Sequence, residues 1–193
     1  FRLLLITGQR LEEVSGLMWS ELNRGSSKWS LPADRAKNGN ASEIHLSGLA
    51  VAELDALSKR KGRGDGWPKR GFVFTTTGET SVSGHSRGKR RLDREVASLA
   101  AKEDEPPMIE PWRLHDLRRT LATGMQRLGV RFEVTEAILN HLSGSKSGVA
   151  GVYQRHEWGP EKETALIAWA DHIKGILANL DKSNVVPLAS VRG

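Results

Sequence analysis

Apolar residues at helical spacing constrain the fold of this chain more than any other feature of its sequence. In WRLHDLRRTLATGMQRLG, Leu114, Leu117 and Leu121 recur three and four positions apart, the spacing of one face of an α-helix. Gly129 closes the segment, as glycine often does at the C-terminal end of a helix. These leucines predict a helix that is anchored in a core and holds its polar residues at the edge of a cleft.

Helical spacing recurs along most of the remaining sequence. Residues 1–22 predict two helices that meet at Thr7 and Gly8, with Thr7 capping the second helix. The second helix has an apolar stripe formed by Leu11, Val14, Leu17 and Met18. The other expected helices are a short one around Tyr153 and the segments 46–60, 86–101, 112–129, 132–141 and 160–180.

Short β-strands are expected in the first half of the chain. Residues 29–31 and 43–46 predict a hairpin, with Asn38-Gly39 as a turn signal between the two strands. The segment FVFT at 72–75 predicts a short buried strand. The expected fold class is therefore mainly α with a small antiparallel β-sheet, an α+β arrangement.

Composition and charge narrow the class of protein. The chain has 193 residues, of which 38% are apolar and 27% charged, which is typical of a soluble globular domain. There are no cysteines, so disulfides and cysteine-ligated metals are excluded, and no apolar run is long enough to cross a membrane. The net charge of +6 favours a polyanionic partner, although a merely basic protein would have the same charge.

Two arginines and a histidine are candidates for an anion site. Arg10 follows TGQ in the first turn of a helix, where backbone N–H groups are unpaired and the helix dipole favours an anion. His115 and Arg118 are three residues apart and share one helix face. The alternatives are a surface arginine beside Glu13, and a solvated basic stripe that includes Arg119.

Two further candidates lie late in the chain. His141 ends a helix at a glycine-rich turn, where a histidine can also serve as a C-terminal cap. Tyr153 is the single tyrosine of the sequence, and half-buried packing is its alternative role.

Taken together with a lysine in the hairpin, these residue types suit phosphodiester transesterification. The arginine fork matches two non-bridging oxygens, and a tyrosine can attack if a base takes its proton. A histidine suits that task near neutral pH. We expect no metal and no cofactor, because the sequence has no H-E-x-x-H motif and its EDE run indicates a solvated loop.

Four segments, in this order, resemble the catalytic domain of tyrosine recombinases, the phage integrase family. They are LLLITGQRLEEVSGLMWSEL, LPADRAKNG, LHDLRRTLAT and ILNHLSGSKSGVAGVYQRHEW. The last of them, together with the tryptophan-bearing segment ETALIAWADHI, looks most like integrases of prophages and genomic islands.

The resemblance implies roles for the candidates. It makes Arg10 the first arginine that clamps the phosphate, with Glu13 in support, and Lys37 the general acid that protonates the leaving 5′-hydroxyl. The histidine that helps manage the tyrosine proton, the second arginine, the late histidine that hydrogen-bonds the phosphate and the nucleophile would be, in that order, His115, Arg118, His141 and Tyr153.

The chain departs from the family pattern in two places. The late histidine usually follows Leu-Gly, but here it follows Leu139-Asn140, and the loop to Tyr153 is longer than in the commonest pattern. The hairpin also holds Lys28 and Arg35 close to Lys37 in sequence, so the identity of the general acid stays open between them.

The resemblance further implies a tyrosine recombinase catalytic-domain fold over residues 1–180, with a tail at 181–193 that is flexible or docks on a neighbour. The chain begins at Phe1 inside an apolar run, so we expect an N-terminal DNA-binding module to be missing from it. The implied function is site-specific recombination of double-stranded DNA, for integration or excision of a mobile element. It would take place in the bacterial cytoplasm, at the nucleoid.

Four protomers would act on two duplexes without ATP, metal or cofactor, although the isolated domain could equally be a monomer. Two other functions stay open: a DNA-binding fragment that is inactive alone, and relaxation of DNA like that of a type IB topoisomerase. We also expect phosphate contacts from the basic helix at 86–101, through Arg87, Lys89, Arg90 and Arg91. The alternative for that helix is a solvated charged face.

Overall fold

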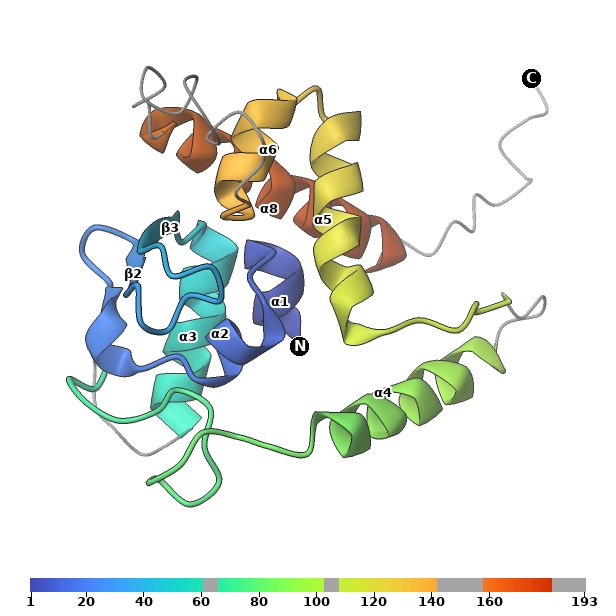
Figure 1. Cartoon of the computed structure of the whole chain (residues 1–193). Helices are drawn as coiled ribbons and strands as arrows, with labels where there is room; N and C mark the ends of the chain where they lie inside the picture. Colours follow the sequence, from blue (N-terminus) through green and yellow to red (C-terminus); the bar gives the residue numbers. More distant parts are fainter. Residues whose placement is uncertain (61–65, 103–107, 142–157, 182–193) are drawn as a thin grey trace.

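The computed structural model describes residues 1–60, 66–102, 108–141 and 158–181. Helices form most of this part of the chain, and a small three-stranded antiparallel sheet lies to one side of them (Figure 1). The predicted fold class is therefore confirmed. In the described ranges no helix is both long and apolar enough to span a membrane.

The first two helices meet at a tight turn. Helix α1 (Arg2–Thr7) ends at Gly8, whose φ of 66° lies in the left-handed region, and a Cβ at this position would lie 2.9 Å from Leu121. Helix α2 (Leu11–Ser15) begins with the backbone N–H of Arg10 donating to Glu13 Oε2 at 3.0 Å. The turn therefore fixes both the direction of α2 and the position of Arg10.

Two details of the predicted N-terminal helices are wrong. Thr7 does not cap α2, because Arg10 is the N-cap residue; the Thr7 hydroxyl donates instead to the carbonyl of Leu3 inside α1 at 2.7 Å. Helix α2 ends at Ser15, so Leu17 and Met18 lie outside it, although Leu17 is fully buried. Core burial therefore continues past the end of the helix and into a short 3₁₀ turn (Trp19–Glu21), of which Trp19 is also buried.

The sheet contains the predicted hairpin and one additional strand. Its order is β1 (Leu22–Asn23), β2 (Lys28–Leu31) and β3 (Ser42–His45), with Trp29 of β2 opposite Ile44 of β3 and both buried. Asn38 and Gly39 lie within the long connection 32–41 rather than in a two-residue turn. The FVFT segment is not a strand, because only an isolated bridge joins Phe72 to Met18.

Three longer helices surround α1. Helices α3 (Gly48–Arg60), α5 (Leu114–Arg127) and α8 (Gly159–Asp181) all contact it (Figure 1). On α5 the predicted apolar face is confirmed, with Leu121 fully buried. Trp169 of α8 packs against Gly124 of α5 and donates its indole N–H to the carbonyl of Leu5 at 2.9 Å. This packing fixes α5 against α1.

The two remaining helices differ in how they are placed. Helix α6 (Phe132–Ile138) packs against α5 and α8 and ends three residues before the predicted boundary, followed by Asn140 with a left-handed φ of 47°. Helix α4 (His85–Ala100) lies along the edge of the molecule, and none of its residues is buried (Figure 1).

Candidate active site

Arg10 and Arg118 meet at the C-terminal end of α6. Arg118, on α5, is only 4% exposed, and its guanidinium donates to the carbonyls of Gly8 and Leu139. Arg10 donates from Nη2 to the next carbonyl, that of Asn140, at 3.5 Å. Two arginines that are 108 positions apart in the sequence (10 and 118) are therefore held by consecutive carbonyls of one turn.

Helix geometry explains why this turn collects cationic donors. The last carbonyls of an α-helix have no partner within the helix, and the helix dipole makes that end negative. The buried side chain of Gln9 satisfies the carbonyl of Ile138 at 2.9 Å, and the two arginines satisfy the next two carbonyls. The end of α6 is thus capped by the α1–α2 turn and by α5.

The arginine pair carries positive charge that the protein neutralises only in part. Burial, followed by the nearby Arg10, lowers the pKa of Arg118 to about 10, against the opposing effect of Glu13 and Glu136. Arg118 is therefore charged at neutral pH but poorly solvated. An anion placed beside the two guanidiniums would be stabilised by both, which is the property expected of a phosphate site.

Glu13 connects this pair to the hairpin. The residue is 2% exposed, and its Oε1 accepts from Arg10 Nη1 at 3.1 Å and from the backbone N–H of Lys37 at 3.3 Å. The carboxylate thus holds the connection 32–41 next to the α1–α2 turn. Glu13 is positioned to support Arg10. The same ion pair would also be present if Arg10 were only a surface arginine beside Glu13, the alternative given by the sequence.

The three cationic side chains of the hairpin region differ in whether they have a partner. Lys28 pairs with Glu43 at 2.7 Å, and Arg35 donates to the carbonyl of Glu13 at 3.0 Å. Lys37 is exposed, and among the described residues no hydrogen bond or ion pair holds its ammonium group. Of these three side chains, Lys37 is therefore the one whose cationic group is available for proton delivery.

Of the two histidines, one lies at the same turn and the other on α5, and the tyrosine falls outside the described ranges. His115 is exposed on α5, one turn before Arg118, and His141 follows Asn140 directly, with Nδ1 at 2.9 Å from Glu136 Oε1. The predicted role of Tyr153 concerns a residue at which the structure gives no description. The structure brings together Arg10, Glu13, Arg118 and the backbone of Lys37. The roles of the six candidate catalytic residues stay predictions.

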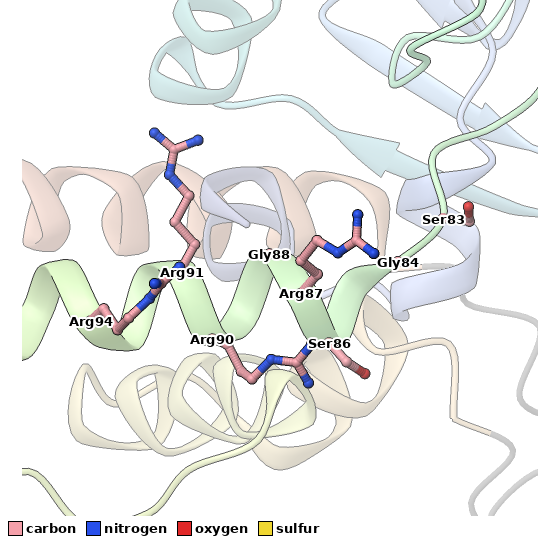
Figure 2. A pocket seen from close by; sticks show the side chains of 8 residues that line it. All are labelled: Ser83, Gly84, Ser86, Arg87, Gly88, Arg90, Arg91 and Arg94. Atoms are coloured by element: carbon pink, nitrogen blue, oxygen red, sulfur yellow. The ribbon is translucent and has the colours of Figure 1, made fainter.

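A second group of basic residues lies along α4. Four arginines extend from its successive turns along an open hollow of about 750 Å³ (Figure 2). They are exposed, and no ion pair joins them to other described residues; they are Arg87, Arg90, Arg91 and Arg94. Lys89 differs, since its side chain is 16% exposed, pairs with Asp93 at 2.6 Å and lies 3.8 Å from the Trp112 ring centroid.

Several residues at these sites were not predicted from the sequence. Gln9, Asn38 and Asn140 join the α1–α2 turn, the hairpin and the end of α6, and their partners are far away in the sequence. Only Asn140 had a visible signal, because it stands where the family pattern has glycine. Arg94 was absent from the predicted DNA contacts, although its spacing of three and four from Arg91 and Arg90 places it on their side of the helix.

The comparisons with known proteins agree with the predicted resemblance. The sequence model of the Phage integrase family matches residues 1–156. The chain is 25% identical over 188 residues to prophage integrase IntA of Escherichia coli (strain K12). The matched region covers 94% of this chain and 41% of that protein.

A solved structure supports the fold. The crystal structure of XerA recombinase superposes with a TM-score of 0.52 at 19% identity, over 88% of this chain and 55% of the other. The chain thus spans about half the length, or less, of the relatives it matches. Because the family model covers most of the sequence, this chain belongs to the phage integrase family.

Proposed function

We propose that this chain is the catalytic domain of a site-specific recombinase that cuts and rejoins double-stranded DNA through a 3′-phosphotyrosyl intermediate. The observation that carries the proposal is the pair Arg10 and Arg118, held at one turn with incompletely neutralised charge, in a chain of the phage integrase family. The biological purpose would be integration or excision of a mobile element.

The proposed reaction is a transesterification at phosphorus. The Tyr153 oxygen forms a bond to the phosphorus as the bond to the 5′-oxygen breaks, and the tyrosine proton passes to His115. Arg10, Arg118 and His141 hold the non-bridging oxygens, whose charge must be stabilised in the transition state.

Lys37 supplies a proton to the departing 5′-oxygen, which leaves as a hydroxyl. A 5′-hydroxyl from a partner strand then reverses the step and releases the tyrosine. The bond energy stays in the phosphotyrosyl link, so no ATP is consumed. Each group is used twice, once for cleavage and once for rejoining.

The exposed arginines of α4 would position the duplex. Phosphate contacts of this kind fix the register of DNA without reading its sequence. Arg87, Arg90 and Arg91 belong to this proposal together with Arg94, whereas Lys89 already has Asp93 and Trp112 as partners. These contacts would add affinity that depends strongly on salt.

The proposal extends to assembly and location. Residues 1–180 would form one catalytic domain, and four such protomers would act on two duplexes in the cytoplasm, at the nucleoid. C-terminal segments of α8 and the tail 181–193 would dock on neighbouring protomers. Exposed apolar residues on the last turns of α8, Ile176 and Leu177, fit such a contact.

The test is covalent trapping on a nicked suicide substrate. The site is first selected from a pool of random duplexes with the Tyr153→Phe variant, which keeps the aromatic ring and should bind DNA without cutting it. The original chain should then form an SDS-stable adduct on that site, and Tyr153→Phe should form none. Adducts that persist in Tyr153→Phe would contradict the assignment of the nucleophile.

Two further outcomes would favour the other functions. Binding without adducts in the original chain would favour a DNA-binding fragment that is inactive alone. Relaxation of a supercoiled plasmid without exchange of strands would favour an activity like that of a type IB topoisomerase.

A further inference from the structure

Asn140 has a backbone conformation that glycine adopts most easily. Its φ of 47° lies in the left-handed region, where asparagine is tolerated better than most other residues. Glycine would therefore satisfy the backbone at this position without any side chain. The amide group of Asn140 has a use of its own, because its Nδ2 donates to the carbonyl of Asn40 at 3.2 Å and to Asn38 Oδ1 at 3.4 Å.

The contact is reciprocal. Asn38 donates from Nδ2 to the carbonyl of Asn140 at 2.7 Å, and this same carbonyl accepts from Arg10 Nη2 at 3.5 Å. Asn38 also orders its own loop, since its Oδ1 accepts from the backbone N–H of Asn40 at 3.1 Å. We call Asn38 and Asn140 the asparagine latch; it joins the connection 32–41 to the end of α6.

Lys37 lies between the latch and a second set of anchors. On the other side of Lys37, Ala36 is buried and Arg35 donates to the carbonyl of Glu13 and to Glu21 Oε2, both at 3.0 Å. The backbone N–H of Lys37 itself is held by Glu13 Oε1. The backbone of Lys37 is thus fixed on both sides, while its side chain extends into solvent.

We propose that the asparagine latch positions Lys37 for delivery of its proton to the leaving 5′-oxygen, an inference that rests on the proposed function. A lysine side chain has several rotatable bonds, so the place of its backbone decides which atoms its ammonium can reach. The latch ties that backbone to the carbonyl that also holds Arg10. The turn at Asn140 therefore positions both Arg10, which binds the phosphate, and Lys37, which delivers the proton.

The chemistry of the leaving group provides the test. An ordinary bridging oxygen leaves as a poor alkoxide unless an acid protonates it. A duplex in which sulfur replaces the bridging 5′-oxygen releases a thiolate instead, and a thiol has a pKa near 8.5 without help. Loss of proton delivery therefore slows cleavage of the oxygen substrate and leaves cleavage of the sulfur substrate nearly unchanged.

Three variants should share this signature on the two nicked duplexes. Asn140→Gly keeps the left-handed backbone and its carbonyl, Asn38→Ala removes the other half of the latch, and Lys37→Ala serves as the benchmark. We expect the two latch variants to form adducts roughly 10-fold more slowly on the oxygen substrate. On the sulfur substrate they should return to within about 3-fold of the original chain.

Arg118→Ala is the matched control, because it should be slow on both substrates. Equal slowing of the latch variants on both substrates, or no slowing on either, would overturn the inference, since a merely structural role does not depend on the leaving atom. Failure of the original chain to form adducts on either duplex would instead contradict the proposed function, and the inference with it.

A double variant tests whether the two asparagines act as one unit. If they do, Asn38→Ala combined with Asn140→Gly should be no slower on the oxygen substrate than Asn38→Ala alone. Multiplied effects would show two independent roles and would contradict the latch.

Discussion

The molecule carries two groups of arginines that differ in almost every physical respect. Arg10 and Arg118 are held by carbonyls and by Glu13 at the end of α6, and Arg118 is almost completely buried. The arginines of α4 are exposed along an open hollow (Figure 2). The first arrangement suits stabilisation of a transition state, which needs charge fixed in advance, and the second suits salt-dependent attachment to a polyanion.

The largest expected effect comes from the buried group. Arg118→Ala should slow adduct formation by on the order of 10²-fold or more, because it removes a fixed charge at the phosphate. It should reduce the slope of log affinity against log salt by no more than about 0.9, the value for one phosphate contact, as measured by affinity at several salt concentrations. A large loss of binding with normal cleavage at saturating DNA would reverse the roles of the two groups.

Glu13→Gln should have the next largest effect. The substitution keeps the shape of the side chain but removes the charge that raises the pKa of Arg118, so this pKa should fall below about 10. Since the charged form of Arg118 is the active one, adduct formation should decline at a lower pH on the alkaline side than in the original chain. A rate profile against pH checks this, and an unchanged alkaline limb would contradict it.

Packing behind the buried group provides a third test. A Cβ on Gly124 would clash with the Trp169 ring, so Gly124→Ala should lower the free energy of unfolding by about 1–3 kcal/mol. Gly175→Ala, on the open side of α8, is the matched control and should raise it by up to about 1 kcal/mol. Chemical denaturation measures both, and equal destabilisation would show that Trp169 is not the cause.

The smallest effect is expected on α4. Arg91→Gln should reduce the slope of log affinity against log salt by about 0.9, the value for one phosphate contact. Lys89→Gln should reduce it by less than half as much, because Lys89 is engaged with Asp93 and Trp112. Equal reductions would show that Lys89 leaves its partners and contacts DNA as the arginines do.

The sequence was informative where the signal was local. The spacing of Leu114, Leu117 and Leu121 predicted α5, and the strand segments on either side of Asn38-Gly39 predicted the hairpin. Local patterns also failed in two places. FVFT has the composition of a strand, but a strand needs a partner, and only an isolated bridge to Met18 forms there. Helix α2 stops at Ser15, with Gly16 as its C-cap, although the apolar stripe continues.

The arrangement of the site depended on contacts that no local pattern encodes. Arg10 and Arg118 were predictable as candidates, but their meeting at the carbonyls that end α6 follows from tertiary packing. The bond from Asn38 to Asn140 spans 102 positions and had no sequence signal beyond a missing glycine. The pairing of Lys89 with Asp93 was visible as an i, i+4 spacing, but the position of Trp112 under the ammonium was not.

The most direct test of the central claim is to identify the residue that carries the DNA. The adduct formed on the nicked duplex is digested with protease and nuclease, and mass spectrometry locates the residue linked to the 3′-phosphate. We expect a single linkage, at Tyr153. A linkage at a serine or at any other residue, or no linkage at all, would contradict it.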